Sequence, residues 1–438
     1  MQPITSNKLR EILNINENIN QTTITNVSTD SRNVDENTLF IALKGEKFDG
    51  HDFIEDVIKK GCPLVVVNKE NKNIPQNKQI VVDDTLKALG KIAHYNRTLY
   101  KGTLIALTGS SGKTTTKELL KQALSVYAKT YATTGNFNNH IGVPRSLLDI
   151  DMDSKYAVIE MGMSNLHEIE YLTSLATPDI AIVTNVYPMH IEFLKTLENI
   201  ALAKSEIFQG LQNKKIAIYN RDTSCTQILE ANAQKHANIV LTYGFDDEIL
   251  SSLNLDDNTP HYQSNALCVL KTLEALGLDN KLAIPTINNF SAPEGRGKKH
   301  QLTINNLHIQ MIDDSYSGQP DAMKLAIKSL GQMQTKGRKI ALIGKMAELG
   351  DYSIKAHQEV GQTLKQENID IVIGVCEETK DMLKELPSST TQYYFDNIQN
   401  VADFLINELF KDNDTILIKG AHYSSKVYEV ANTLKKYQ

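Results

Sequence analysis

The sequence predicts an α/β fold divided among about three domains. The chain has 438 residues, and at roughly 150 residues per domain it can form about three hydrophobic cores. Apolar residues make up 41% and charged residues 22%, which is typical of globular proteins. Short apolar runs alternate with helix-like stretches, and this order is typical of parallel strands joined by helices.

The strongest strand predictions are apolar runs, several of which end at glycine or at a polar cluster. Strands that end in this way commonly open into binding loops at the carboxyl edge of a parallel sheet. The predicted strands cover residues 64–67, 103–107, 156–160, 180–184, 216–219, 339–343, 369–375 and 415–418.

Two composition changes suggest the domain boundaries. A helical stretch over residues 85–100 ends just before an apolar strand, and residues 291–297 contain one proline and two glycines before a new strand-like run. We therefore expect domains at residues 1–100, 101–296 and 297–438.

Charge, cysteine content and hydropathy exclude several classes of protein. Lys and Arg total 46 against 52 Asp and Glu, a formal net charge of -6, and the absence of a long basic run argues against a nucleic-acid partner. The four cysteines lie far apart without metal-ligand spacing, so neither a disulfide framework nor a structural zinc site is expected. The N-terminus lacks a signal-peptide pattern and no stretch of 18 uncharged apolar residues occurs, so we expect a cytoplasmic protein without a membrane span.

A phosphate-binding loop is the most specific motif. Residues 104–118 read LIALTGSSGKTTTKE, an apolar strand followed by a Gly/Ser loop and an amphipathic helix. Gly109 and Gly112 allow the backbone to approach phosphate oxygens, Lys113 supplies a positive charge, and the Thr114 hydroxyl is placed to bind magnesium. Leu107 stands where the general motif has its first glycine. The alternative is a Gly/Ser turn that merely caps a helix.

Three further residues are candidates for a metal site. Glu160 ends a predicted central strand, His190 follows the strand over 180–184, and Lys204 lies among apolar residues in a predicted helix over 199–208. Thr114 and Glu160 would supply the oxygen ligands that magnesium prefers. The alternatives are a solvated strand end for Glu160, an ordinary hydrogen-bonded histidine, and a lysine that reaches solvent.

Ten motifs together resemble the Mur ligase family, the ATP-dependent amide-forming enzymes of peptidoglycan synthesis, over nearly the whole chain. Five are general to the family: residues 108–118, 133–144, 156–164, 184–193 and 203–211. Five others are similar to the members that add D-alanyl-D-alanine: STDSR at 28–32, FDGHDF at 48–53, EGRG at 294–297, DDSY at 313–316 and MAELGDYS at 346–353.

The resemblance implies an architecture and an activity. The expected domains are a small mixed N-terminal domain that binds the UDP substrate, a central P-loop ATPase-like parallel-sheet domain, and a C-terminal Rossmann-like domain that binds the incoming dipeptide. The implied reaction adds D-alanyl-D-alanine to UDP-N-acetylmuramoyl-tripeptide through an acyl phosphate, with ATP and two Mg²⁺ ions, in a monomer.

The resemblance also implies roles for individual residues. Lys113, His190 and Lys204 are the implied catalytic residues, and Thr114, Glu160, His190 and a carbamoylated Lys204 are the implied metal ligands. The ATP site comprises Gly109, Ser110, Ser111, Gly112, Lys113, Thr114, Thr115, Asn265, Arg296 and Asp314. The UDP-linked substrate is expected to contact Ser31, Arg32, Asn138 and Asn139.

Departures from the family pattern leave alternatives open. Only Asn265 remains of the two asparagines usual near the adenine, with Tyr262 available to stack on the base. Residues 313–322, 344–346 and 419–422 also differ from the family motifs. The alternatives are another Mur-type ligase, a folylpolyglutamate-type ligase, or an ATP-binding paralogue without ligase activity.

Overall fold

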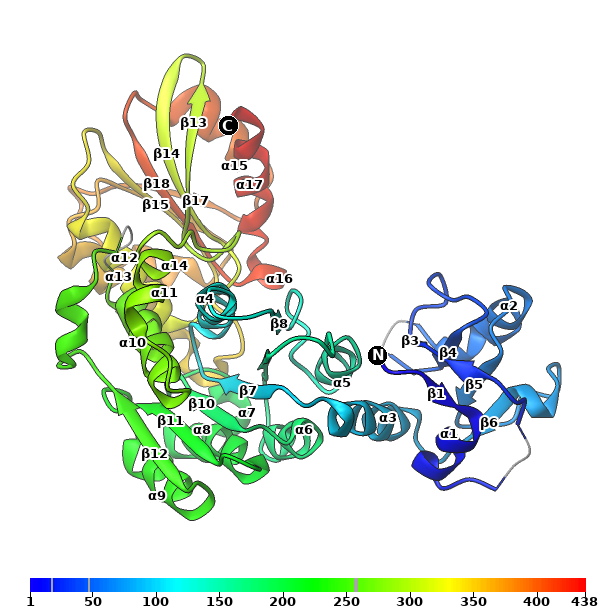
Figure 1. The fold of residues 1–438 in the computed structure, drawn as a ribbon. Helices are drawn as coiled ribbons and strands as arrows, with labels where there is room; N and C mark the ends of the chain where they lie inside the picture. The colour runs from blue at the N-terminus through cyan, green and yellow to red at the C-terminus, as the bar shows by residue number, and fades with distance from the viewer. Residues whose placement is uncertain (17–18, 46–47, 256–258) are drawn as a thin grey trace.

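The first domain combines a parallel sheet with a small antiparallel pair. The computed structural model describes residues 1–16, 19–45, 48–255 and 259–438, and the chain passes through three α/β domains (Figure 1). The elements of this part are β1 (Ile4–Thr5), α1 (Ser6–Leu13), β2 (Thr23–Ile24), β3 (Asn26–Ser28), β4 (Thr38–Ile41), α2 (Ile54–Lys59), β5 (Leu64–Val67), β6 (Gln79–Val81) and α3 (Thr85–Leu99). Strands β3-β4-β5-β6 form the parallel sheet in that order, and β1 pairs with β2 antiparallel. The expected mixed character of the domain is therefore confirmed.

Helix α3 joins the first domain to the second. It begins at Asp84, whose carboxylate accepts hydrogen bonds from the backbone N–H groups of Leu86 and Lys87 and so caps the helix. Its buried residues share one apolar cluster with α1 and with the central domain. The core is therefore continuous across this connection, although Figure 1 shows the sheet of the first domain well separated from the central sheet.

The central domain is a parallel sheet covered by helices on both faces. Its elements are β7 (Thr103–Thr108), α4 (Lys113–Ser125), β8 (Thr130–Ala132), α5 (Gly142–Leu148), β9 (Tyr156–Glu160), α6 (Glu168–Ala176), β10 (Ile180–Val183), α7 (Ile191–Leu194), α8 (Leu197–Ser205), β11 (Ile216–Asn220), α9 (Thr226–His236), β12 (Ile239–Tyr243), α10 (Pro260–Ala275) and α11 (Asn280–Asn288). The strand order is β12-β11-β10-β7-β9-β8.

Alternate residues of the central strand β7 enter two different cores. Leu104 and Ala106 pack toward α3, α5 and α6, whereas Ile105 and Leu107 pack toward α4 and α10. A strand buried on both faces reads as a continuous apolar run, which explains why this strand was predictable. The predicted helix over 199–208 is divided: α8 ends at Ser205 and a 3-10 helix continues over Glu206–Gly210.

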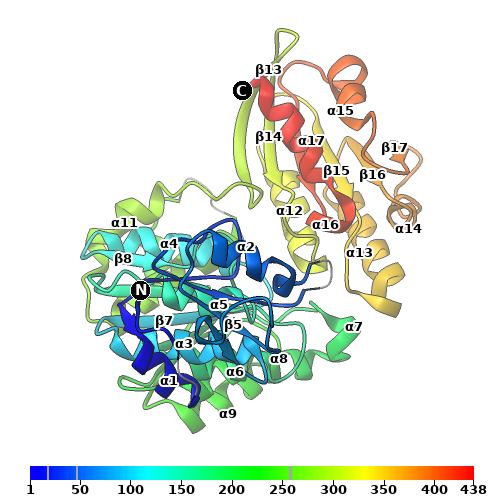
Figure 2. The ribbon, with the colours of Figure 1, turned by 90° about the vertical axis from the view of Figure 1, so that its right-hand side faces the viewer.

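The third domain contains a mixed sheet between two helical layers. Its elements are β13 (Lys298–Ile304), β14 (Leu307–Asp314), α12 (Pro320–Gln332), β15 (Lys339–Gly344), α13 (Ser353–Gln366), β16 (Ile371–Val375), α14 (Thr379–Leu383), β17 (Thr391–Phe395), α15 (Val401–Phe404), β18 (Thr415–Lys419), α16 (His422–Ser425) and α17 (Val427–Leu434). In the order β13-β14-β18-β15-β16-β17, only β13 runs antiparallel to its neighbour. Figure 2 shows this domain above the central domain.

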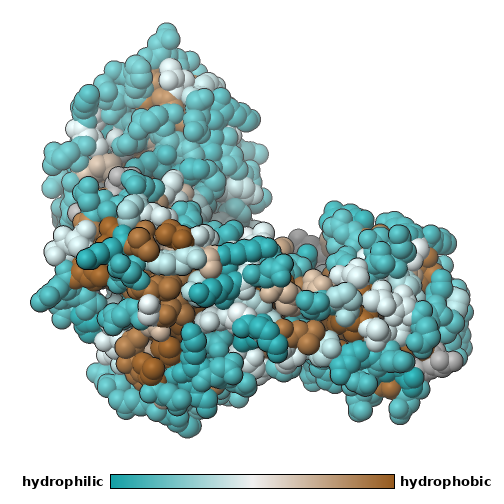
Figure 3. All heavy atoms as spheres, viewed as in Figure 1, coloured by the Kyte–Doolittle hydropathy of each residue, from teal (hydrophilic) through white to brown (hydrophobic). Residues whose placement is uncertain are grey.

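The surface is mainly hydrophilic on the third domain, whereas apolar residues gather over part of the central domain in the view of Figure 3.

All four cysteines are free, as the sequence led us to expect. Within the described residues, no helix combines the length and apolar character needed to cross a membrane.

Candidate active site

The loop between β7 and α4 forms a tight turn that only glycine accommodates at two positions. Gly112 has a φ of 76° at the start of α4, and an added Cβ would lie 2.6 Å from Asn265 Oδ1. A Cβ at Gly109 would collide with the hydroxyl of Thr184. The loop is therefore pressed against α10 on one side and the end of β10 on the other, and the start of α4 is open to an anion.

Residues after β10 hold the phosphate-binding loop in place. Asn185 Oδ1 accepts a hydrogen bond from the backbone N–H of Ser111 at 2.8 Å, and its amide donates to the Ser111 carbonyl at 3.0 Å. The Ser110 hydroxyl donates to the Tyr187 carbonyl and accepts from the Tyr187 N–H. The sequence predicted the loop but not these partners, which come from about 75 residues away in the motif at 184–193.

Lys113, Thr114 and Glu160 meet at the carboxyl edge of β7 and β9. The ammonium of Lys113 donates to the Gly109 carbonyl at 2.8 Å, and desolvation lowers the pKa of Lys113 to about 8 although Glu160 opposes the shift. The Thr114 hydroxyl and the Asn138 amide donate to Glu160 Oε1 at 3.3 and 2.8 Å. The other oxygen, Oε2, is buried and has no hydrogen-bond partner within the described part of the chain, so a cation could bind this oxygen directly.

His190 reaches the same pocket, whereas Lys204 does not line it. His190 lines the pocket beside Lys113 and Glu160, and its Nδ1 forms an ion pair with Glu348 of the third domain. This contact holds the pKa of Glu348 below its usual value. Lys204 is 2% exposed, and burial together with the charge of Lys113 holds the pKa of Lys204 well below its usual value.

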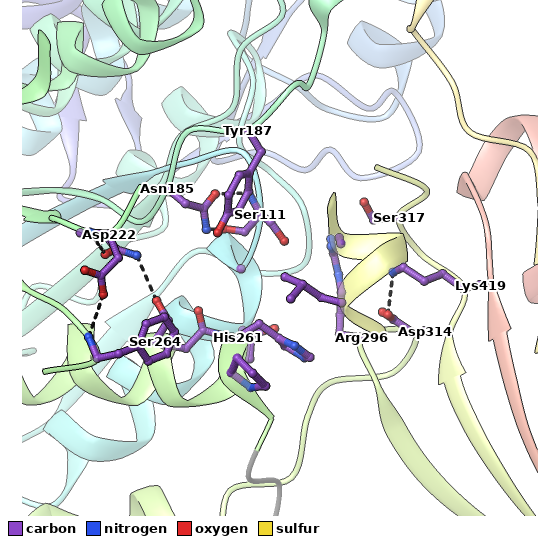
Figure 4. A pocket seen from close by; sticks show the side chains of 18 residues that line it. Ser111, Asn185, Tyr187, Asp222, His261, Ser264, Arg296, Asp314, Ser317 and Lys419 are labelled. Atoms are coloured by element: carbon purple, nitrogen blue, oxygen red, sulfur yellow. Dashed lines mark hydrogen bonds and ion pairs between the residues drawn. The ribbon is translucent and has the colours of Figure 1, made fainter. Parts of the chain in front are cut away.

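A pocket between the central and third domains lies on one side of the loop. Figure 4 shows Ser111, Tyr187 and Asp222 on the central-domain side and Asp314 and Lys419 on the opposite side, with Arg296 between them. The predicted nucleotide residues that line this pocket are Ser111, Gly112, Thr115, Asn265, Arg296 and Asp314. The structure thus brings together residues from both sides of the domain boundary.

Arg296 and Asp314 have defined partners in this pocket. The Arg296 guanidinium lies 3.9 Å from the centre of the Tyr316 ring and donates to the Thr114 hydroxyl at 3.3 Å. Asp314 forms a 2.6 Å ion pair with Lys419 at the end of β18. Lys419 was not among our predicted site residues, although the motif that contains it is visible in the sequence.

A second pocket lies on the other side of the loop. It is lined by Ser110, Lys113, Thr114, Asn138, Asn139, Glu160 and His190 among others, and it shares Ser111, Gly112, Arg296 and Ser317 with the first pocket. The two cavities therefore meet at the phosphate-binding loop. Lys113 and Glu160 line the second cavity beside this loop.

Ser31 and Arg32 lie outside both pockets. They follow β3 in the first domain, where the Arg32 side chain is exposed and pairs with Asp30 at 2.8 Å. The pKa of Asp30 is lowered to about 2 mainly by the hydrogen bond from Arg32, with a smaller effect from Arg145 of α5. This loop therefore faces the central domain at a distance from the phosphate-binding loop.

The expected stacking of Tyr262 on a base is wrong. Tyr262 is 3% exposed, stacks on Phe290 and donates its hydroxyl to the Ile287 carbonyl, because α10 turns this position into the core. Phe245 is an aromatic side chain that does line the nucleotide-side pocket, with 44% of its surface exposed. Phe245 lies two residues after the end of β12 and belongs to none of the motifs found in the sequence.

Lys117 is a further site residue that the sequence analysis missed. Its side chain is fully buried, donates to the Gly135 carbonyl at 2.9 Å and lies 3.8 Å from Glu160 Oε2. Its position four residues after Lys113 places it one helical turn further along α4. The four-residue spacing from Lys113 was the signal available in the sequence, but the burial of the Lys117 side chain could not be predicted from it.

Comparisons with known proteins match all three domains. Family models match the Mur ligase family catalytic domain over residues 23–97, the Mur ligase middle domain over 107–287, and the Mur ligase glutamate ligase domain over 301–422. Each of these ranges falls mainly within one of the three domains described above.

Individual relatives match over most of their length. The UDP-N-acetylmuramoyl-tripeptide--D-alanyl-D-alanine ligase of Rickettsia prowazekii is 34% identical over 421 residues, with 90% of this chain and 92% of the relative covered. A crystal structure of MurF from Acinetobacter baumannii superposes with a TM-score of 0.89 at 28% identity, with 99% of each chain covered. MurF from Thermotoga maritima in complex with ADP has a TM-score of 0.81 at 25% identity, with 94% of this chain and 97% of that chain covered.

Proposed function

Since the chain belongs to the Mur ligase family, we propose that it adds D-alanyl-D-alanine to UDP-N-acetylmuramoyl-tripeptide in an ATP-dependent step of peptidoglycan synthesis. The observation that carries this proposal is the pair of pockets that meet at Ser111, Gly112 and Arg296, with Lys113, Thr114 and Glu160 lining the second pocket beside this junction. A nucleotide in one pocket would present its terminal phosphate to a carboxylate in the other. The relatives that match over nearly their whole length carry the name of this activity.

The residues at the junction fit a magnesium–nucleotide complex. Glu160 Oε2 is buried and has no hydrogen-bond partner among the described residues, and the Lys117 ammonium at 3.8 Å is beyond hydrogen-bond distance. A buried carboxylate oxygen in this state is further stabilised when a cation binds it directly. Thr114 and Glu160 would hold one Mg²⁺, and His190 would help to hold a second. Bound magnesium stabilises negative charge on the transferring phosphoryl group.

The reaction requires activation of a carboxylate. The substrate carboxylate oxygen attacks the γ-phosphorus of ATP, ADP leaves, and an acyl phosphate forms. The amine of D-alanyl-D-alanine then attacks the acyl carbon, phosphate leaves, and loss of a proton yields the amide. Lys113 and Arg296 place positive charge beside the phosphates, and enclosure between the domains keeps water from the acyl phosphate.

We assign the remaining predicted contacts to the substrates. Asn265 and Asp314 line the nucleotide-side pocket and would bind adenine and ribose. Asn138 and Asn139 line the second pocket and would contact the muramoyl peptide. Ser31 and Arg32 would hold the UDP end, with the dipeptide entering from the third domain. One chain supplies all these residues, so we propose that the protein acts as a monomer. Its use of ATP fits a location in the cytoplasm, where ATP is available.

Lys204 is proposed to be carbamoylated. Only the neutral amine reacts with carbon dioxide, and the lowered pKa of this buried lysine favours the neutral form. The carbamate would place an anionic oxygen near the metals. A ¹³C NMR signal for a carbamate in protein incubated with ¹³C-bicarbonate, absent from Lys204→Ala, tests this assignment. Equal signals in both proteins, or none in either, would reject it.

Phosphate release tests the proposed ligase reaction. The protein with ATP and Mg²⁺ should release phosphate only when both UDP-N-acetylmuramoyl-tripeptide and D-alanyl-D-alanine are present, and mass spectrometry should find the tripeptide substrate extended by the dipeptide. ATP binding without release would favour a paralogue without ligase activity. Release with a folate and glutamate instead would favour a folylpolyglutamate-type ligase.

A further inference from the structure

The contact between α7 and the third domain involves the histidine proposed to hold the second metal. His190 has a φ of 56° at the start of α7, and the side chain is 14% exposed. Figure 2 shows α7 on the side of the central domain that lies below α13. The facing loop follows β15 and contains Glu348, whose φ of 57° is uncommon for a residue other than glycine.

Three independent contacts join this loop to α7. Glu348 Oε2 contacts His190 Nδ1, and the Glu348 carbonyl accepts a hydrogen bond of 3.4 Å from the Glu192 N–H. Ile191 packs against the third-domain apolar cluster that contains Met346 and Leu349. Both the backbone and the side chain of Glu348 therefore face the first turn of α7.

The Glu348 side chain is open to solvent on the side away from His190. It is 46% exposed, whereas the His190 side chain is 14% exposed, so solvent weakens what the pair contributes to the free energy of folding. A neutral imidazole that donates from Nδ1 to a carboxylate keeps the lone pair on Nε2, and this outer contact fixes the orientation of a metal-binding ring. His190 lines the pocket that contains Glu160, so a metal ion held in that pocket would lie beside its ring.

We propose that Glu348 is a positioning residue that orients His190 from across the domain boundary, so that the second metal position is complete only when the third domain rests on α7. This inference depends on the proposed metal-binding role of His190. The first position, at Thr114 and Glu160, lies entirely within the central domain and does not depend on Glu348. The protein thereby couples domain closure to completion of the metal site.

Manganese binding in the presence of ADP, followed by electron paramagnetic resonance, tests the proposal without requiring turnover. In Glu348→Ala the weaker of two Mn²⁺ sites should lose roughly 10- to 100-fold in affinity, while the tighter site and ADP affinity remain unchanged. Glu348→Gln, which retains a carbonyl acceptor, should show a smaller loss. Glu378→Gln is the matched control, because Glu378 is an acidic third-domain residue paired with Lys345 instead of His190.

His190→Ala separates failure of this inference from failure of the proposed function. Loss of the weaker site in His190→Ala but not in Glu348→Ala would overturn the positioning role alone. An unchanged weaker site in both variants would reject the metal role of His190 and, with it, the inference. A loss in Glu378→Gln equal to that in Glu348→Ala would show that the effect is not specific to the contact, and would also overturn the proposal.

Discussion

The start of α4 and the end of α8 each carry a desolvated lysine, and the two differ in their neighbours. Desolvation lowers the pKa of both, but Lys113 also donates to the Gly109 carbonyl and is attracted by Glu160. Lys204 is repelled by Lys113 and has no hydrogen-bond partner for its ammonium among the described residues. The neighbours of Lys113 therefore favour its cationic form, whereas the surroundings of Lys204 favour the neutral amine.

Replacement of Lys113 should have the largest effect. Lys113→Met removes the cation beside the phosphates and should lower kcat/KM by roughly 10³-fold, since charge stabilisation is the main contribution in such sites. The rate of phosphate release at varied substrate concentration measures kcat/KM. Lys121→Met on the exposed face of α4 is the control. A Lys113→Met variant within tenfold of the unaltered protein would remove Lys113 from the proposed mechanism.

Replacement of Lys204 should have the next largest effect. Lys204→Met keeps most of the buried volume but cannot form a carbamate, and we expect roughly a 10²-fold loss of kcat with little change in the KM for ATP. Steady-state kinetics with and without bicarbonate measure both values. The matched control is Lys214→Met, an exposed lysine before β11. If the kcat of Lys204→Met still depends on bicarbonate, Lys113 and Lys204 do not differ in the way described above.

The pKa of Lys113 predicts a pH dependence of stability. Its value is about 8 in the folded protein and 10.5 in the unfolded reference, so the unfolded chain binds more protons between these values and stability rises with pH. The contribution is fully present above pH 10.5 and is lost as pH falls through about 8. Its size is at most about 3 kcal/mol, reduced by solvent in the pocket.

Urea unfolding from about pH 7.5 to about pH 9.5 measures this dependence. Lys113→Met should gain stability relative to the unaltered protein at the lower pH, and the gain should shrink at the higher pH. The same sign is expected for Lys204→Met, because burial also lowers the pKa of Lys204. A difference between Lys113→Met and the unaltered protein that does not vary with pH would contradict the shifted pKa.

The smallest effect should come from replacing Arg32, a charged residue that lies away from both Lys113 and Lys204. Arg32 is exposed and pairs with Asp30 in the first domain. Arg32→Ala should raise the KM for the UDP-linked substrate severalfold, because charge contacts to phosphate are removed, and should leave the KM for ATP and the thermal midpoint unchanged. A raised KM for ATP would mean that the first domain influences the nucleotide site directly.

Local patterns predicted eight buried strands but not the remaining short strands of the first domain or the edge strands β12 and β17. Each of the eight predicted strands is present, because strands buried on both faces are continuous apolar runs, and only their ends differ. The strand predicted over residues 369–375 begins at Ile371, since Asp370 instead accepts a hydrogen bond from the backbone of Lys339. Such end effects depend on neighbouring strands and have no signal in a short stretch of sequence.

The candidate site was predicted unevenly. Glu160 and Lys113 were found because each lies next to a recognisable strand end or loop. Lys117 and Glu348 were missed because their partners, Gly135 and His190, are distant in sequence. The stacking proposed for Tyr262 failed for the same reason: which face of α10 is buried is decided by the sheet beneath it.

The place of the phosphate-binding turn follows from local sequence, since glycine at 109 and 112 and the lysine and threonine that follow are a local arrangement. The alternation of strands and helices also follows from local sequence. The pKa values of Lys113 and Lys204 and the surroundings of Glu160 depend instead on the folded structure. Desolvation and neighbouring charges set those properties, and both arise from segments that meet only after the chain has folded.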